Sequence, residues 1–383
     1  MGASSSSSDR ENSGVLTLLG QGAAGVDYIA VVDKFPSPDD KVRVREATQA
    51  GGGNVANSLT AVTRLDTTIR CKLLTKIGQD SAGSAVVAEL KADNVDTSLV
   101  VSSSATSTGF TYVLVDVSSS TRTCIHTPQQ EELTESDVAP AQLDGVDWVH
   151  LDSRHTSAAL ELARLANARG IPVSLDAEKN RPPHFDALVR LCDLLFTNEH
   201  FPALFLGSTG SAESSSLQEQ EQREEEAVLA LLALPGGLRA HTVVMSLGAR
   251  GSLLVSRATS SPPSSSSASE IDLVSGACAR LGLLGVKMTH SQGAADEQLR
   301  VLRCPAWPLP REDIVDTTGA GDAFIGGFLF ARMHGAADEQ CLQLGTLCAA
   351  AKIRRAGARA GLPSLKDVMS TLAREEEARA SRP

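Results

Sequence analysis

The residues that most constrain how this chain folds are Asp-Thr-Thr-Gly-Ala-Gly-Asp at positions 316–322. Ile314 and Val315 before them suit an extended segment, whereas Phe324 and Phe328 after them are four residues apart, the spacing of one helix face. The glycines are therefore predicted to lie at a helix N-terminus. There the first backbone N–H groups have no partner within the helix, and the macrodipole is positive.

A helix start of this kind suits a phosphate or a developing oxyanion. Because glycine has no side chain, Gly319 and Gly321 let a ligand approach the backbone around Ala320 closely. Asp322 follows in the first turn, where its carboxylate can take the proton of an attacking hydroxyl while the backbone holds the charge of a transferred phosphoryl group. A capped helix start with an ordinary first-turn Asp is the alternative.

A second glycine-rich segment, Gly51–Asn57, lies near the other end of the chain. Gly52 and Gly53 let a ligand come close to the backbone, and Asn54 and Asn57 have the spacing of two residues on one face of a helical turn. Two amides there can bind neighbouring hydroxyl groups. A glycine-rich loop that ends in an Asn helix cap is the alternative.

The two segments together resemble the two signatures of the ribokinase-like (PfkB) carbohydrate kinases, and they occur in the expected order. The resemblance covers roughly residues 15–365. It implies an α/β fold with a mainly parallel central sheet, helices on both faces and a small β-sheet lid over the sugar site. It also implies ATP-dependent, Mg²⁺-dependent phosphoryl transfer to a hydroxyl group, with Asp322 as the base and residues 319–321 as the anion hole.

The resemblance assigns further residues to the two substrates. Asp27 is expected to hold sugar hydroxyls together with Gly52, Gly53, Asn54 and Asn57. The expected nucleotide-binding residues are Asn198, Ser246, Gly248, Gly251, Thr317 and Cys348. The residues that match the first half of a monovalent-cation site, which binds potassium in relatives, are Asp316 and Thr318.

Two departures from the family pattern concern cations. Many relatives carry Asn-x-x-Glu, a motif linked to magnesium and phosphate, but here Phe201 stands three residues after Asn198. Residues 357–361, Gly-Ala-Arg-Ala-Gly, lack the Ser that is usual in the second half of the monovalent-cation motif. Magnesium is still expected, because the transferred phosphoryl group needs charge neutralisation. The protein group that orients magnesium stays open, and potassium activation depends on a motif that is only half present.

Short apolar strands alternate with helical segments between the two signatures. This order by itself predicts a mainly parallel sheet with helices on both faces. One domain is predicted over residues 15–370, preceded by a Ser-rich disordered leader (1–14) and followed by a charged, frayed tail (371–383). A low-complexity insertion without a periodic element is predicted near residues 259–300.

Alternating apolar and polar residues predict lid strands near residues 33–48 and 107–127, the first of them around Lys41–Arg45. The apolar face of so small a sheet is hard to bury without a partner, so a homodimer through the lid is expected.

Residues Gly20–Gly25 match the G-x-G-x-x-G pattern of dinucleotide-binding folds. Such a fold requires a full helix after the glycines, whereas Pro36 and Pro38 would end any helix early. An NAD site is therefore disfavoured. Asp27 is expected at the C-terminal edge of this first strand.

Composition limits the possible partners. The net charge of −11, without a basic cluster, argues against nucleic-acid binding. No apolar run reaches the ~18 residues of a membrane span. The seven cysteines are scattered without a Cys-x-x-Cys pair, which is typical of a reducing, cytoplasmic setting. The partners that the resemblance implies are a sugar and ATP, besides a second copy of the chain.

Three segments resemble ketohexokinases in particular, namely Thr121–His126, Trp148–Arg154 and Glu178–Lys179. They favour a ketohexose such as fructose, phosphorylated on a primary hydroxyl. Ribose, or a nucleoside such as adenosine or pseudouridine, is the alternative acceptor, and a nucleoside base needs an apolar or aromatic wall. The aromatic residues that could form this wall are Tyr28, Phe110 and Tyr112. A sugar- or nucleotide-sensing protein with a kinase fold and no turnover is the second alternative.

Overall fold

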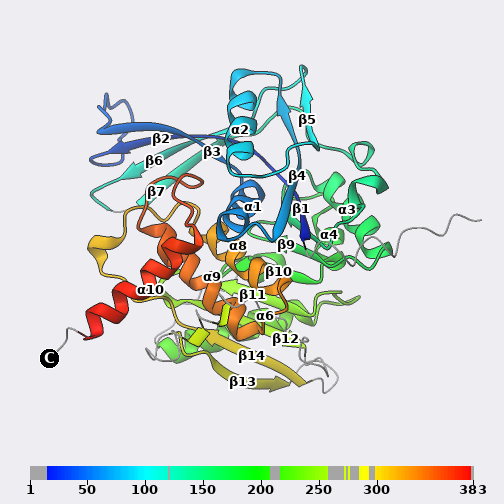
Figure 1. Cartoon of the computed structure of the whole chain (residues 1–383), viewed down its shortest axis with the longest axis vertical. Coiled ribbons are helices and arrows are strands. Elements are labelled where there is room, and N and C mark those ends of the chain that lie inside the picture. Colours follow the sequence, from blue (N-terminus) through cyan, green and yellow to red (C-terminus); the bar gives the residue numbers. More distant parts are fainter. Residues whose placement is uncertain are drawn as a thin grey trace, which may run out of the picture.

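Two sheets of unequal size organise the chain in the computed structural model, which describes residues 15–119, 121–207, 216–257, 271–272, 275–276, 284–292 and 298–380 (Figure 1). Over these residues the larger sheet has ten strands in the order β13-β14-β12-β11-β10-β9-β8-β1-β4-β5. Their bounds are β1 Leu16–Gln21, β4 Ile69–Gly78, β5 Val100–Ser103, β8 Trp148–Asp152, β9 Val173–Asp176, β10 Leu194–Asn198, β11 Thr242–Ser246, β12 Ser252–Arg257, β13 Lys287–Gln292 and β14 Gln298–Cys304.

The seven strands from β11 to β5 pair in parallel, whereas β12, β14 and β13 extend the sheet in antiparallel pairs. Successive side chains of a strand point to opposite faces. Leu18 and Leu19 accordingly belong to two separate buried clusters. Both faces of the sheet are therefore buried, as its apolar strands require.

Helices cover both faces of the large sheet, which confirms the predicted fold class. The helices that contribute to the cluster of Leu18 are α1 Asn54–Leu65, α2 Ser81–Ala92, α8 Ala320–Met333, α9 Asp338–Ile353 and α10 Leu365–Ala380. The helices that contribute to the cluster of Leu19 are α3 Thr156–Ala168, α4 Phe185–Leu191, α5 Phe201–Phe205 and α6 Leu217–Leu232. Short 3-10 helices span Glu135–Asp137, Pro140–Leu143, Gly248–Arg250 and Arg311–Asp313. No helix in the described part of the chain is long and apolar enough to span a membrane.

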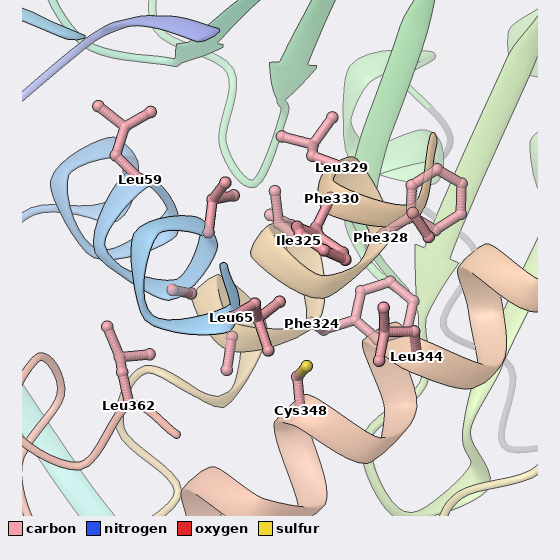
Figure 2. Packing of buried hydrophobic residues seen from close by; sticks show 14 of the residues in the cluster. Leu59, Leu65, Phe324, Ile325, Phe328, Leu329, Phe330, Leu344, Cys348 and Leu362 are labelled. Atoms are coloured by element: carbon pink, nitrogen blue, oxygen red, sulfur yellow. The ribbon is translucent and has the colours of Figure 1, made fainter. Parts of the chain in front are cut away.

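Helix α8 lies between α1 and α9 and packs closely against both (Figure 2). A Cβ atom at Gly326 would lie 2.5 Å from Ala61 of α1, and one at Gly327 would lie 2.7 Å from the Sγ atom of Cys348 on α9. Cys348 is 1% exposed in this helix contact. Core packing accounts for its position, and its assignment to the nucleotide site remains a prediction.

The smaller sheet has the strand order β3-β2-β6-β7 in the described residues. Its strands are β2 Gly25–Val32, β3 Glu46–Gly52, β6 Phe110–Asp116 and β7 Thr121–Thr127. The strand predicted around Lys41–Arg45 was wrong, because this stretch is exposed and irregular and β3 begins only at Glu46. Asp27 lies on β2, not at the end of the first strand, because the chain leaves the large sheet at Gln21. A strand rather than a helix follows Gly20–Gly25, in agreement with the exclusion of an NAD fold.

Two predictions about the end of the chain need correction. The predicted insertion near 259–300 was expected to hold no periodic element, but β13 and the first residues of β14 lie within it. Residues 258–270, and the leader at 1–14, lie outside the described residues. The charged tail is helical up to Ala380, as part of α10.

Candidate active site

The two glycine-rich segments meet where α1 packs against α8. Both helices begin directly after a glycine of positive φ, Gly53 for α1 and Gly319 for α8. The amide Nδ2 of Asn57 donates a 2.8 Å hydrogen bond to Oδ2 of Asp322, although the two residues are 265 positions apart. The structure thus joins the predicted sugar-binding segment to the predicted base.

The start of α8 is open to a ligand. Gly319 has a φ of 80°, and a Cβ atom there would lie 2.9 Å from the carbonyl oxygen of Ala358. Only glycine fits this position without strain. At Gly321, by contrast, a Cβ atom would meet no atom within 4 Å, because this glycine faces the cavity. Bare backbone at the positive end of a helix is thereby presented to whatever occupies the cavity.

Asp322 has a strongly perturbed carboxyl group. Its side chain reaches the cavity but is surrounded by protein atoms, and this desolvation raises its pKa to about 7. The hydrogen bond from Asn57 lowers the pKa, whereas the nearby carboxylates Glu178, Asp27 and Asp152 raise it. A carboxyl group that titrates near neutrality is suited to act as a general base.

A cavity of about 490 Å³ brings the predicted sugar-binding residues together with Asp322. Asp27 reaches it from β2, and a Cβ atom at Gly52 would lie only 2.6 Å from the Asp27 carboxyl carbon. Burial raises the pKa of Asp27, while Arg359 and a hydrogen bond from Thr111 lower it. The predicted residues that line this cavity are Asp27, Gly52, Gly53, Asn54, Asn57, Thr317, Thr318, Gly319, Gly321 and Asp322.

Arg359 holds the first glycine-rich segment in place from the C-terminal part of the chain. Its side chain is 2% exposed, and its guanidinium group donates to the carbonyl oxygen of Gly52 at 2.8 Å and to Oδ1 of Asn57 at 3.3 Å. Because Asn57 accepts from Arg359, its Nδ2 group is directed towards Asp322. Arg359 therefore orients Asn57 and, through it, the contact with the predicted base Asp322.

Three cationic side chains line the same cavity from other elements. Arg122 reaches it from β7 and donates a 2.6 Å hydrogen bond to Oγ1 of Thr317, in the loop before α8. Arg154 and Lys179 follow the C-terminal ends of β8 and β9. These cations face a cavity whose other charged lining groups are carboxylates, so anionic phosphate groups can be accommodated there.

A second, smaller cavity of about 130 Å³ adjoins the first, because Asn54, Glu178, Gly321 and Asp322 line both. The predicted nucleotide residues Asn198 and Ser246 lie in it. The Asn198 side chain accepts from the backbone N–H groups of residues 200 and 201 and donates to the Glu178 carbonyl oxygen at 3.1 Å. It thereby fixes Glu178 at the junction of the two cavities.

Gly248 and Gly251 line neither of these cavities. They form the turn between β11 and β12, where Gly251 has a φ of 92°. A Cβ atom at Gly251 would lie 2.0 Å from the carbonyl oxygen of Cys304. Packing and conformation therefore account for Gly251, and its nucleotide role remains a prediction.

The described residues contain no group of three or more His, Cys, Asp or Glu side chains arranged to hold a metal ion. Magnesium bound to a nucleotide keeps several waters and needs only one or two carboxylates. Asp176 and Glu178 offer such oxygens in the smaller cavity. Burial, with Glu178 close by, raises the pKa of Asp176 well above its usual range, so a cation would suit this carboxyl group. The residues present therefore fit a hydrated magnesium ion.

In the potassium site predicted at Asp316 and Thr318, the Asp316 oxygens already accept from other groups. The Asp316 carboxylate accepts from the backbone N–H groups of Thr318 and Gly357, each at 2.8 Å. The buried ammonium group of Lys352 lies against Asp316 as well.

Sequence reasoning gave no role to Lys352, Arg359, Asp152 or Asp176. Arg154 and Lys179 were noted only as parts of segments that resemble ketohexokinases. A signal for Lys352 does exist, because a charged residue within the small apolar run Cys348–Ile353 is unusual for a buried helix.

The large sheet is covered by helices on both faces, and α8, which follows Gly319, carries Asp322 beside a polar cavity. This combination is typical of a small-molecule kinase with the ribokinase-like fold. The sequence matches the model of the "pfkB family carbohydrate kinase" over residues 18–274 and 299–365, and the chain belongs to this family.

Individual relatives agree with this membership. A ribokinase of Staphylococcus aureus (strain COL) is 24% identical over 91% of this chain and 96% of its own. An ATP-dependent ribose-1-phosphate kinase of Halopiger xanaduensis is 26% identical over 50% of this chain, which spans 64% of that relative. A ketohexokinase of Mus musculus is 26% identical over 44% of this chain and 59% of its own.

Among solved structures, a ribokinase of Cryptococcus neoformans var. grubii serotype A in complex with ADP superposes with a TM-score of 0.71. The match covers 93% of this chain and 99% of that one, at 18% sequence identity, and so supports the fold.

Proposed function

We propose that this protein transfers the γ-phosphoryl group of ATP to a primary hydroxyl of a small sugar, with a ketohexose such as fructose as the favoured acceptor. The observation that carries the proposal is the Asp322 carboxylate, which faces the larger cavity beside the bare N-terminus of α8. Asp27, Asn54 and Asn57 line the same cavity and supply acceptors and donors for sugar hydroxyls.

In this mechanism Asp322 takes the proton of the attacking hydroxyl as the new bond to phosphorus forms. Its pKa of about 7 leaves a large ionised fraction at neutral pH while keeping a useful affinity for the proton. The N–H groups at Gly319, Ala320 and Gly321 hold the charge of the transferred group. Arg122, Arg154 and Lys179 add positive charge around the phosphates.

Magnesium, when bound to the ATP phosphates, neutralises charge that develops during transfer. Asp176 and Glu178 are the residues we assign to it, directly or through water. The small sheet supplies Asp27 and Arg122 to the cavity, so it acts as a lid that excludes water and limits wasteful ATP hydrolysis.

The choice of acceptor rests on the shape of the lid. In the pairing of β2 with β6, Asp27 lies opposite Thr111 and Tyr28 lies opposite Tyr112. Because side chains alternate between faces, both tyrosines lie on the face of the sheet that does not carry Asp27. Phe110 lies on the same face by the same alternation, and its ring packs edge-on against both tyrosine rings. The Asp27 face of β2 and β6 therefore offers no aromatic wall for a nucleoside base, which favours a sugar. The ketohexokinase-like residues Arg154 and Lys179 favour a ketohexose, while the ribokinase matches make ribose the alternative.

The outer face of the lid supports the expectation of a homodimer. Tyr112 and Ile125 lie opposite each other in the pairing of β6 with β7 and are 50% and 52% exposed. Exposed apolar side chains on a four-stranded sheet gain from a covering partner.

The experiment is an ADP-release assay with Mg-ATP and a panel of fructose, ribose, ribose 1-phosphate and adenosine, with Asp322→Asn as the blank. Turnover of fructose well above the blank supports the full proposal. Preference for ribose or adenosine retains the kinase reaction and corrects the acceptor. No turnover of any acceptor, although ATP binds, would overturn the proposed activity.

A further inference from the structure

Lys352 is a fully buried lysine in the last turn of α9, with a side chain that is 0% exposed. Its Nζ atom donates to the carbonyl oxygen of Asp316 at 2.9 Å and to that of Arg355 at 3.0 Å. The carboxylate Oδ2 of Asp316 lies 3.5 Å away. Three acceptors therefore satisfy the three N–H bonds of one ammonium group.

The surroundings favour a charged group in spite of burial. Desolvation lowers the pKa of Lys352, while the Asp316 carboxylate raises it. The ammonium group also lies at the C-terminal end of α9, where the free carbonyl groups of a helix attract a cation. On the active-site side, repulsion by the Arg122 cation disfavours the charged form of Lys352, whereas attraction by the Asp322 carboxylate favours it. A buried lysine with this set of acceptors is a site for positive charge, not a packing residue.

This charge is connected to the anion hole through Asp316. The Asp316 carboxylate accepts from the N–H groups of Thr318 and Gly357, and the Asp316 N–H group donates to the carbonyl oxygen of Ile353. Residues 317 and 318 lead directly into Gly319, where α8 begins. Lys352 therefore holds the segment whose shape sets the positions of the anion-binding N–H groups.

We propose that the Lys352 ammonium group is a built-in monovalent cation that positions the loop before α8, so that this protein needs no free potassium. The inference rests on the proposed phosphoryl transfer. It replaces the expectation that Asp316 and Thr318 bind potassium, because these residues do not fit that ion. Lys352 already occupies the Asp316 carbonyl oxygen, and residues 357–361 contain no Ser to complete a cation site. A second cation on the same oxygen would meet a like charge at close range.

The first test uses the unmodified protein and varies only the salt. ADP release and the thermal unfolding midpoint are measured in KCl, NaCl and choline chloride at equal ionic strength. We expect both quantities to agree between the salts, with rates within about twofold. A severalfold rise of the rate in KCl, or a rise of the midpoint specific to KCl, would overturn the proposal.

The second test removes the ammonium group in two ways. Lys352→Ala leaves a cavity lined by carbonyl oxygens, so we expect ADP release to fall at least tenfold in choline chloride and to recover in part with KCl or methylammonium chloride. The unfolding midpoint of this variant should also rise by about 2 °C or more in KCl, because potassium would bind the folded protein and not the unfolded chain. Lys352→Met keeps the bulk without the charge, so it should lose activity and gain nothing from either salt.

Lys91→Ala is the matched control, because Lys91 is an exposed lysine in the last turn of α2. It should behave as the unmodified protein in every salt. A folded Lys352→Ala variant without any response to potassium or methylammonium would overturn the positioning role. The midpoint needs no acceptor sugar, so its potassium dependence tests Lys352 even where the proposed reaction fails. If Lys352→Ala does not fold, the salt series on the unmodified protein still decides.

Discussion

Replacing Asp322 by Asn should reveal two effects of its carboxylate, one on turnover and one on the stability of the folded protein. The Asn side chain has nearly the same shape, and its carbonyl oxygen can still accept the 2.8 Å hydrogen bond from Asn57. The change removes the base, so turnover should fall by roughly 10²-fold or more. It also removes a charge that the folded state desolvates, so the variant should be more stable than the unmodified protein at alkaline pH.

The size of the stability gain follows from the pKa. Desolvation raises the pKa of Asp322 from 3.8 to about 7. A difference of about three units, at about 1.36 kcal/mol each, gives an upper bound of about 4 kcal/mol, since the side chain keeps some access to the cavity. Between about pH 4 and 7 the folded protein binds more protons here than the unfolded chain, so its stability falls as pH rises through this window. The gain of the variant should therefore be absent near pH 4 and complete above pH 7.

The assay is thermal unfolding of both proteins at pH 5 and pH 8, next to ADP release. For a chain of this size about 4 kcal/mol corresponds to a midpoint difference of roughly 5 °C. Asp186→Asn serves as a control, because Asp186 lies in the first turn of α4 with an exposed side chain. Near-normal turnover of Asp322→Asn would refute the assignment of the base. An equal midpoint difference at both pH values would refute the raised pKa.

Two further predictions concern the same site. The kcat/KM of the unmodified protein should rise tenfold per pH unit below about pH 7 and level off above it, because burial raises the pKa of Asp322 to about 7. Since the hydrogen bond from Asn57 lowers this pKa, Asn57→Ala should shift the rising part of the pH profile to higher pH. A pH profile that does not shift would contradict the effect of this hydrogen bond on the pKa. Gly321→Ala should unfold at the normal temperature yet lose activity, because its methyl group would extend only into the cavity. Gly319→Ala should destabilise the fold by ~1 kcal/mol or more, since φ is 80° and the new Cβ atom would lie 2.9 Å from the carbonyl oxygen of Ala358. Equal unfolding midpoints for the two variants would contradict this difference.

The fold class could be predicted from the sequence because its signals are local. Short apolar strands that alternate with helices indicate an α/β sheet, and a glycine pair before a helical period indicates a helix start. The structure confirms both predictions, since the large sheet is mainly parallel and α8 begins directly after Gly319. The same rules failed for the lid, where Val42 and Val44 alternate with charged residues but remain 45% and 47% exposed. Alternation shows that one face could be buried and does not show that another strand is available to pair.

The candidate site was predictable only in part, for a related reason. Asp322, Asn54 and Asn57 stand within recognisable motifs. Lys352 and Arg359 were not assigned a role, because their roles depend on contacts with Asp316 and Gly52. The apolar run around Lys352 marks that lysine as unusual but does not identify its partner. Cys348 shows the opposite situation, since its position is explained by packing against Gly327 and its assignment to the nucleotide site remains a prediction.

The hydrogen bond between Asn57 and Asp322 has a consequence for how active molecules arise in the cell. Its two halves are made at opposite ends of synthesis, and Arg359, which orients Asn57, emerges later still. A product that ends before Arg359, through early termination or proteolysis, therefore lacks the group that orients Asn57. Such a product would be inactive, so activity requires that the chain has been made and folded at least as far as Arg359.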